Sequence, residues 1–148
     1  FRNDAPQDFI VAVDREQFFR ALLNLFRNAV EALDSAGSTV GPPAIRVQAA
    51  RDNGAVSILI ADNGPGLPSA ARDNLFSAFR GAARPGGTGL GLAIAADLVR
   101  AHGGVIGLKE VADPAWPGAA FEIRLPAPDG ATRSGAQRRE QPPERTIS

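Results

Sequence analysis

The chain changes character most abruptly within residues 56–67, VSILIADNGPGL. The apolar run at the start of this stretch predicts a buried strand, and the NGPG that follows cannot continue it. Asp62 therefore stands where the strand ends, at a position that a sheet holds rigidly. Upstream, Asp52-Asn53-Gly54 is a hairpin turn signal that pairs the strand with a preceding one at 45–49.

A long helix is predicted before this hairpin, from about Arg15 to Leu33. Asp14 precedes it and can accept hydrogen bonds from the free amides of the first turn. Apolar residues recur at three- and four-residue spacing and predict one core face. That predicted face comprises Phe19, Leu22, Leu23, Phe26, Val30 and Leu33, widened by Phe18, Leu25 and Ala29.

A second long helix is predicted from near Gly89 to about Ala101, ended by Gly103-Gly104. Its inward residues are expected to be Leu92, Ala95, Ala96 and Val99. A short helix is predicted within 69–76, and further strands at 9–13, 105–111 and 120–125.

This order of elements predicts an α+β fold, a two-layer α/β sandwich with a mixed sheet of about five strands and helices on one face. We expect the folded domain to occupy residues 1–126. Residues 127–148 are rich in Pro, Gly, Arg, Gln and Glu and are expected to form a disordered C-terminal tail.

Composition excludes several classes of function. The 148 residues are 44% apolar, which suffices for a core, and 16 basic side chains balance 16 acidic ones. No broad electrostatic footprint for nucleic acid or an anionic membrane is therefore expected. Without cysteine there is no disulfide, zinc knot or thiol nucleophile. No apolar run approaches the ~20 residues that span a bilayer. We expect a cytoplasmic domain without membrane contact, excised from a longer parent because methionine is absent. That parent could be membrane-anchored or soluble.

One polar line interrupts the apolar first helix. Asn24 and Asn28 lie four residues apart, about 40° from one another around the helix, and Glu31 lies on the same side of the helix. A solvated face would explain such a line. The alternative is an oxygen ligand for Mg²⁺, which accepts amide carbonyls and waters.

The strand-end residues Asp62, Gly64 and Gly66 form a second candidate site. The carboxylate could accept from an exocyclic amine such as adenine N6, and the glycines let the backbone approach a flat ligand closely. A plain tight turn opened by an aspartate would explain the same residues.

The third candidate is residues 86–92, GGTGLGL, which open the second helix. Free amides at a helix start without side chains in the way can bind an anion. The stretch lacks the Lys-Ser/Thr ending of a Walker loop and does not follow a strand as a dinucleotide fingerprint does. A phosphate site of another kind and a flexible hinge both remain open.

Taken together, these stretches resemble the catalytic domain of sensor histidine kinases across roughly residues 9–125. Residues 24–29 look like the N box, 62–66 like the first glycine box, 76–79 like the F box and 87–94 like the second glycine box. The AHGG at 101–104 is also typical of that family. The resemblance implies the Bergerat ATP-binding fold, shared with gyrase, mismatch-repair ATPases and the heat-shock chaperone of that superfamily.

The resemblance also implies roles for these residues. Asn28 would ligate Mg²⁺, Asn24 would assist at the phosphates, and both would count as catalytic. Asp62 would bind the adenine amine. The cofactor-binding set is Asn24, Asn28, Glu31, Asp62, Gly64, Gly66, Leu67, Thr88, Gly89, Leu90, Gly91 and Leu92. Residues 68–87 would form a short ATP lid that resembles the nitrogen-regulation type.

ATP-hydrolysing relatives carry a glutamate where this chain has Asn24, whose amide has no useful basicity, so little hydrolysis is expected. The domain would instead donate the γ-phosphoryl of Mg-ATP to a histidine on a dimerisation domain absent from this chain, and reach a bacterial response regulator through that domain in a two-component phosphorelay. The isolated domain is expected to be monomeric. Two alternatives are a degenerate nucleotide-sensing module and an anti-sigma-factor-type serine kinase, although Gly-Leu-Gly-Leu favours the histidine kinases.

Four residues have no settled role in the sequence. His102, the sole histidine, lacks the surroundings of a phospho-acceptor and is expected to cap or pack against the second helix. Arg80 and Arg84 lie in the predicted lid and could reach the γ-phosphate or remain solvated. Trp116 is expected at a hairpin end, with no functional account.

Overall fold

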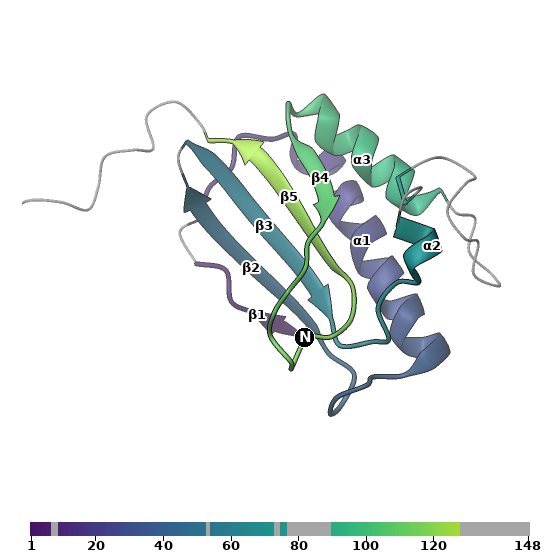
Figure 1. The fold of residues 1–148 in the computed structure, drawn as a ribbon. Coiled ribbons are helices and arrows are strands. Elements are labelled where there is room, and N and C mark those ends of the chain that lie inside the picture. Colours follow the sequence, from purple (N-terminus) through teal and green to yellow (C-terminus); the bar gives the residue numbers. More distant parts are fainter. Residues whose placement is uncertain (7–8, 53, 73–74, 77–89, 128–148) are drawn as a thin grey trace, which may run out of the picture.

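A layer of helices covers one face of a single sheet in the computed structural model, which describes residues 1–6, 9–52, 54–72, 75–76 and 90–127 (Figure 1). The elements in chain order are β1 Arg2–Asn3, α1 Arg15–Ala36, β2 Ile45–Asp52, β3 Ala55–Asp62, α2 Ser69–Arg72, α3 Gly91–Ala101, β4 Val105–Leu108 and β5 Ala120–Pro126. None of the helices within these residues is both long and apolar enough to cross a membrane.

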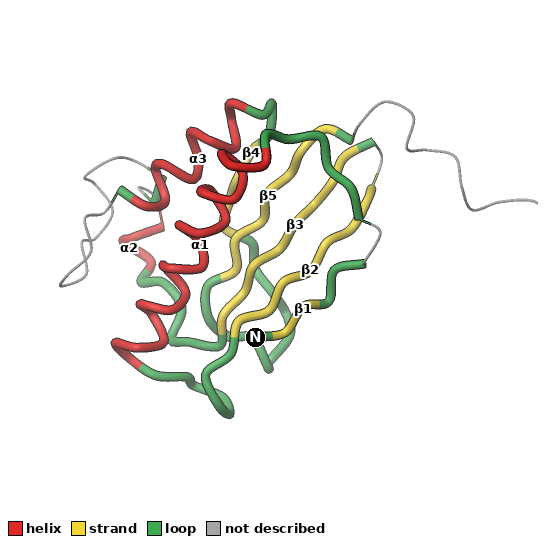
Figure 2. The backbone as a smooth tube through the Cα atoms, turned by 180° about the vertical axis from the view of Figure 1, so that it is seen from behind, coloured by secondary structure: helices red, strands yellow, loops and turns green. Residues whose placement is uncertain are grey.

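The sheet has five strands in the order β1-β2-β3-β5-β4. β1 pairs parallel with β2, whereas the other neighbours pair antiparallel. Figure 2 shows α1 and α3 lying side by side on the same face. The predicted fold class, a mixed sheet of about five strands with helices on one face, is confirmed.

The core lies between the two long helices and the inner face of β3 and β5. Val56, Ile60 and Ile123 are almost completely buried there. From the helix layer, Leu25 of α1 and Val99 of α3 are wholly buried against them. Because the core is shared by all the main elements, both helices are held in fixed positions over the sheet.

The predicted core face of α1 was partly wrong. Phe19, Leu23 and Val30 are 63%, 47% and 45% exposed, and the buried residues are Phe18, Ala21, Leu25, Ala29, Ala32 and Leu33. The helix must approach both the sheet and α3, and small alanine side chains permit that contact. Periodicity gave weight to the large apolar residues, although three of them are exposed.

The strand predicted at residues 9–13 is not formed. Phe9, Val11 and Val13 do pack against the core, which explains their alternation, but the segment joins no ladder. A side chain bonds its backbone instead, since Arg51 donates from Nη2 to the Ile10 carbonyl at 2.7 Å. The strand that pairs with β2 on this side is the shorter β1.

The predicted turns and helix ends agree with the structure better than the predicted core face of α1 and the predicted strand at 9–13. Gly54 and Gly103 have φ values of 75° and 71°, as a hairpin turn and a helix end require. The predicted short helix is reduced to α2 and the strand predicted at 105–111 to β4. The predicted tail falls outside the described residues except for Ala127, whose N–H still donates to the Gly54 carbonyl at 2.8 Å.

Candidate functional site

The two long helices are tied together at one end by Asp14 and His102. Asp14 caps α1, because its Oδ1 accepts from the Gln17 N–H at 2.8 Å. The Asp14 N–H donates to Nε2 of His102 at 3.0 Å, and His102 Nδ1 lies 2.7 Å from the Leu98 carbonyl of α3. The expected capping and packing role of His102 is therefore confirmed, and it links the start of α1 to the end of α3.

At the other end of α3, Asn24 of α1 lies against the helix start. A Cβ added to Gly91 would be 3.3 Å from Asn24 Oδ1, while Asn24 Nδ2 donates to the Arg20 carbonyl at 2.9 Å. The amide is thereby oriented with its oxygen towards α3. The predicted site residues Asn24 and Gly91 are brought together.

The first turn of α3 has amides without a hydrogen-bond partner inside the helix. Its N-cap, Leu90, makes no side-chain cap bond within the described residues, and the first bond in the helix runs from the Ile94 N–H to the Leu90 carbonyl. The N–H groups of Gly91, Leu92 and Ala93 precede that bond and have no partner inside the helix. Together with the positive end of the helix dipole, such amides are suited to bind an anion.

Asn28 lies one turn after Asn24 on the same side of α1. It is half-buried, and its amide makes no hydrogen bond to any other described residue. An amide oxygen that accepts from none of the described residues, one turn from Asn24, suits a hard cation that arrives with phosphate oxygens. Glu31 continues the line as an exposed side chain.

Asp62 is buried at the end of β3, with 2% of its surface exposed. Its Oδ1 accepts from the Gly64 N–H at 2.9 Å and from the Ala119 N–H at 3.3 Å. A Cβ on Gly64 would lie 2.9 Å from the same oxygen, so only glycine allows the chain to turn so tightly around the carboxylate. The predicted rigid strand-end carboxylate is confirmed.

The turn continues through Gly66 and Leu67. Gly66 has a φ of 76°, and a Cβ there would be 3.4 Å from the Pro117 carbonyl oxygen. Leu67 is partly buried against the core and supplies an apolar surface beside the carboxylate turn. These two predicted residues therefore shape one wall near Asp62.

Asn63 is a residue of this turn whose importance was missed. It is 4% exposed, its Oδ1 accepts from the Ala44 N–H, and its Nδ2 donates to the carbonyls of Val40 and Pro42. It thus fixes the loop between α1 and β2 beside the strand end. The partners lie about twenty residues away, so no local sequence pattern could have indicated them.

Helix α1 spans the distance between the two halves of the site. Asn24 contacts the start of α3, and Leu33 Cδ2 lies 3.5 Å from the Cβ position of Gly64. Nine residues of helix separate these contacts, about 14 Å along the axis. An extended nucleoside triphosphate can bridge that distance with its base at Asp62 and its phosphates at Gly91.

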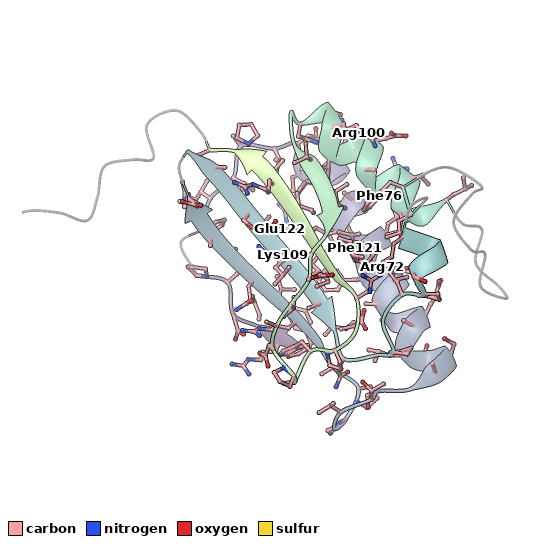
Figure 3. The ribbon with its side chains drawn as sticks, viewed as in Figure 1. Arg72, Phe76, Arg100, Lys109, Phe121 and Glu122 are labelled. Carbon is pink, nitrogen blue, oxygen red and sulfur yellow. The ribbon has the colours of Figure 1, made fainter. Side chains whose placement is uncertain are left out.

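Part of the predicted site lies outside the described residues. This applies to Thr88 and Gly89, to Arg80 and Arg84, and to most of the predicted lid. Of the predicted F box only Phe76 is described, and its ring meets Phe121 edge-on with centroids 6.2 Å apart (Figure 3).

No group of three or more His, Cys, Asp or Glu side chains within the described ranges could form a metal cage. A clear electrostatic perturbation is seen at Glu122 of β5. Hydrogen bonds from Lys109 and Ser57 hold the pKa of the Glu122 carboxyl below its ordinary value of 4.5. Figure 3 shows Lys109 and Glu122 together on the sheet face away from the helices, where Nζ and Oε1 are 2.6 Å apart.

Comparison with known proteins bears on the same residues. The family model of histidine kinase-, DNA gyrase B-, and HSP90-like ATPases matches residues 13–129. The nitrogen regulation protein NtrY of Azorhizobium caulinodans is 37% identical over 128 residues, which cover 86% of this chain and 16% of NtrY. The sensory histidine kinase/phosphatase NtrB of Klebsiella oxytoca is 38% identical over 122 residues, which cover 76% of this chain and 32% of NtrB.

A solved structure gives a similar result. The mycobacterial sensor histidine kinase MprB superposes with a TM-score of 0.69 at 32% identity, covering 86% of this chain and 82% of the solved one. The chain thus spans only 16% and 32% of the lengths of NtrY and NtrB, while it matches nearly all of the solved MprB chain.

Proposed function

The chain belongs to the family of histidine kinase-, DNA gyrase B- and HSP90-like ATPases, and we propose that it is the catalytic ATP-binding domain of a two-component sensor histidine kinase. It binds Mg-ATP and donates the γ-phosphoryl to a histidine on the dimerisation domain of the same kinase. The phosphoryl group then passes to a response regulator. The similarity to NtrY and NtrB supports this assignment, including its nitrogen-regulation character.

One observation carries the proposal: α1 holds Asn24 against the open first turn of α3 and Leu33 against the turn around Asp62. The base occupies the strand-end region, where the Asp62 carboxylate accepts from the adenine amine. The phosphates lie at the amides that follow Leu90. Thr88 and Gly89 are assigned to the same phosphate-binding stretch by their place in the sequence.

Asn28 lies between these two ends and is the proposed Mg²⁺ ligand, with waters and phosphate oxygens as the other ligands. The ion neutralises charge on the phosphates when it is bound. The chain's own contribution is positioning: α1 and α3 orient the phosphate chain so that the γ-phosphoryl faces an incoming histidine. Asn24 offers no base for activating water, which favours transfer over hydrolysis.

The test is single-turnover transfer from γ-labelled ATP to the dimerisation domain of the parent protein, followed by acid treatment. Acid-labile label on the dimerisation domain supports the proposal. Acid-stable label on another acceptor would indicate a serine kinase. Saturable ATP binding without transfer to any acceptor would indicate a degenerate nucleotide-sensing module.

A further inference from the structure

The connection between β4 and β5 closes over Asp62. The Asp62 N–H donates to the Ala119 carbonyl at 3.0 Å, and the Gly118 N–H donates to the Asp62 carbonyl at 3.2 Å. The Ala119 N–H reaches the carboxylate itself. A Cβ on Gly118 would lie 2.0 Å from Asp62 Oδ1, so the loop backbone is in direct contact with the carboxylate.

Trp116 anchors this loop two residues before that contact. Its side chain is 8% exposed and packs with Ala61 and Ala120 in a small cluster separate from the main core. Ala61 and Asp62 are successive residues of β3, so their side chains point to opposite faces of the sheet. The ring therefore contacts the strand end from the face opposite the carboxylate.

Arg46 of β2 holds the ring in place. Its guanidinium carbon lies 5.6 Å from the centroid of the Trp116 ring, within the range of a cation–π interaction. The same guanidinium pairs with Asp4 at 3.1 Å and with Asp113 at 3.2 Å. Asp113 belongs to the loop and accepts from the Ala115 N–H and, through its carbonyl, from the Trp116 N–H.

The short segment between the anchor and the carboxylate has almost no side chains of its own to set its position. Gly118 has none, Ala119 has a methyl group, and the Pro117 carbonyl sits against Gly66. Ala119 is buried next to β5 and fixes one end of the segment. On the other side of Gly118 the nearest buried side chain is Trp116, because Pro117 is exposed.

We propose that Trp116, held by Arg46, is a positioning residue for base recognition: it sets the β4–β5 loop so that the Gly118 and Ala119 backbone orients the Asp62 carboxylate towards adenine. The inference rests on the proposed function, because it assigns the base to Asp62. A carboxylate in that orientation favours the adenine amine and repels the guanine carbonyl oxygen, so Trp116 controls the preference for ATP over GTP.

The test is the ratio of the dissociation constants for GTP and ATP, measured by calorimetry. Trp116→Leu is expected to reduce this ratio about tenfold, because a misplaced carboxylate loses its hydrogen bond to the base. Trp116→Phe should retain most of the ratio. Arg46→Met keeps the Trp116 ring but removes the cation above it, and should also reduce the ratio of the dissociation constants. It provides the test if Trp116→Leu does not fold.

Leu59→Ala is the matched control, since Leu59 packs against the same outer cluster without belonging to the loop. It should lower thermal stability and weaken both nucleotides equally, leaving the ratio unchanged. A folded Trp116→Leu or Arg46→Met with the wild-type ratio overturns the positioning role while the proposed function stands. Wild-type protein that binds neither nucleotide, or prefers neither, overturns the assignment of the base to Asp62 itself.

Discussion

Asn24 Oδ1 of α1 lies 3.3 Å from the position that a Cβ atom would take on Gly91, the first residue of α3. Few real Cβ contacts are that short, so the two helices are as close as a glycine at this position permits. The contact brings the amide oxygen of one helix to the open first turn of the other.

Gly91→Ala is therefore expected to separate stability from binding. Alanine favours a helix over glycine by about 0.5–1 kcal/mol, so thermal stability should be kept. The added methyl displaces Asn24 or the first turn of α3, and ATP affinity should fall about tenfold. Gly107→Ala is the control, because nothing lies within 4 Å of its Cβ position. Equal ATP affinity in the two variants would contradict the assignment of phosphates to this helix start.

Asn28→Ala should remove the dependence of ATP binding on Mg²⁺. The wild-type affinity is expected to fall when Mg²⁺ is replaced by EDTA, whereas the variant should bind with similar affinity in both conditions. Transfer to the parent's dimerisation domain should fall at least about tenfold. Arg27→Ala, on the exposed side of the same helix, should behave as wild type. Unchanged transfer by Asn28→Ala would defeat the assignment of Asn28.

The observed core face of α1 predicts that replacing Leu25 and replacing Leu23 by alanine will lower the free energy of unfolding by unequal amounts. Leu25→Ala removes a wholly buried side chain and should lower the free energy of unfolding by about 2–5 kcal/mol. Leu23→Ala alters a side chain that is 47% exposed and should cost less than about 1 kcal/mol. Urea titration followed by circular dichroism measures both. Similar losses would mean that the helix is rotated from the position described.

Glu122 predicts a pH-dependent contribution to stability. Its pKa is lowered in the folded state by hydrogen bonds from Lys109 and Ser57, so its stabilisation is present above the unfolded pKa and is lost as the pH falls through the folded one. Ser57→Ala should therefore lower the free energy of unfolding by about 0.5–1 kcal/mol at neutral pH. The difference from wild type should shrink as the pH falls below 4.5.

The control for this titration is Asp97→Asn, which removes the exposed i,i+3 pair with Arg100. It should change stability little at any pH, since exposed pairs contribute little. A difference between Ser57→Ala and wild type that stayed constant down to strongly acidic pH would show that the Glu122 carboxylate is not responsible.

His102 predicts a further stability effect at the junction of the two long helices. His102→Ala leaves the Asp14 N–H and the Leu98 carbonyl without their ring partner and should cost about 1–2 kcal/mol. Long-range nitrogen–proton spectra should show the neutral ring with its proton on Nδ1, because Nε2 accepts from Asp14. A proton found on Nε2 would contradict this arrangement.

Much of the fold followed from local chemistry. Asp14 capped its helix, Gly54 and Gly103 ended their elements with positive φ, and Asp62 stood rigidly at a strand end. Each of these depends on neighbours within a few residues, so the amino-acid pattern carries it. The order of the four motifs at 24–29, 62–66, 76–79 and 87–94 also indicates an ATP-binding domain from the sequence alone.

Tertiary structure decided the rest. Which side of α1 is buried depended on the space that α3 and the sheet leave, so Phe19, Leu23 and Val30 are exposed despite their periodicity. The alternating residues at 9–13 pack against the core without joining a ladder, and the strand that pairs with β2 is β1. Asn63 and Trp116 matter through partners about twenty to seventy residues away. Contacts at such separation depend on how the whole chain packs, and no local pattern encodes them.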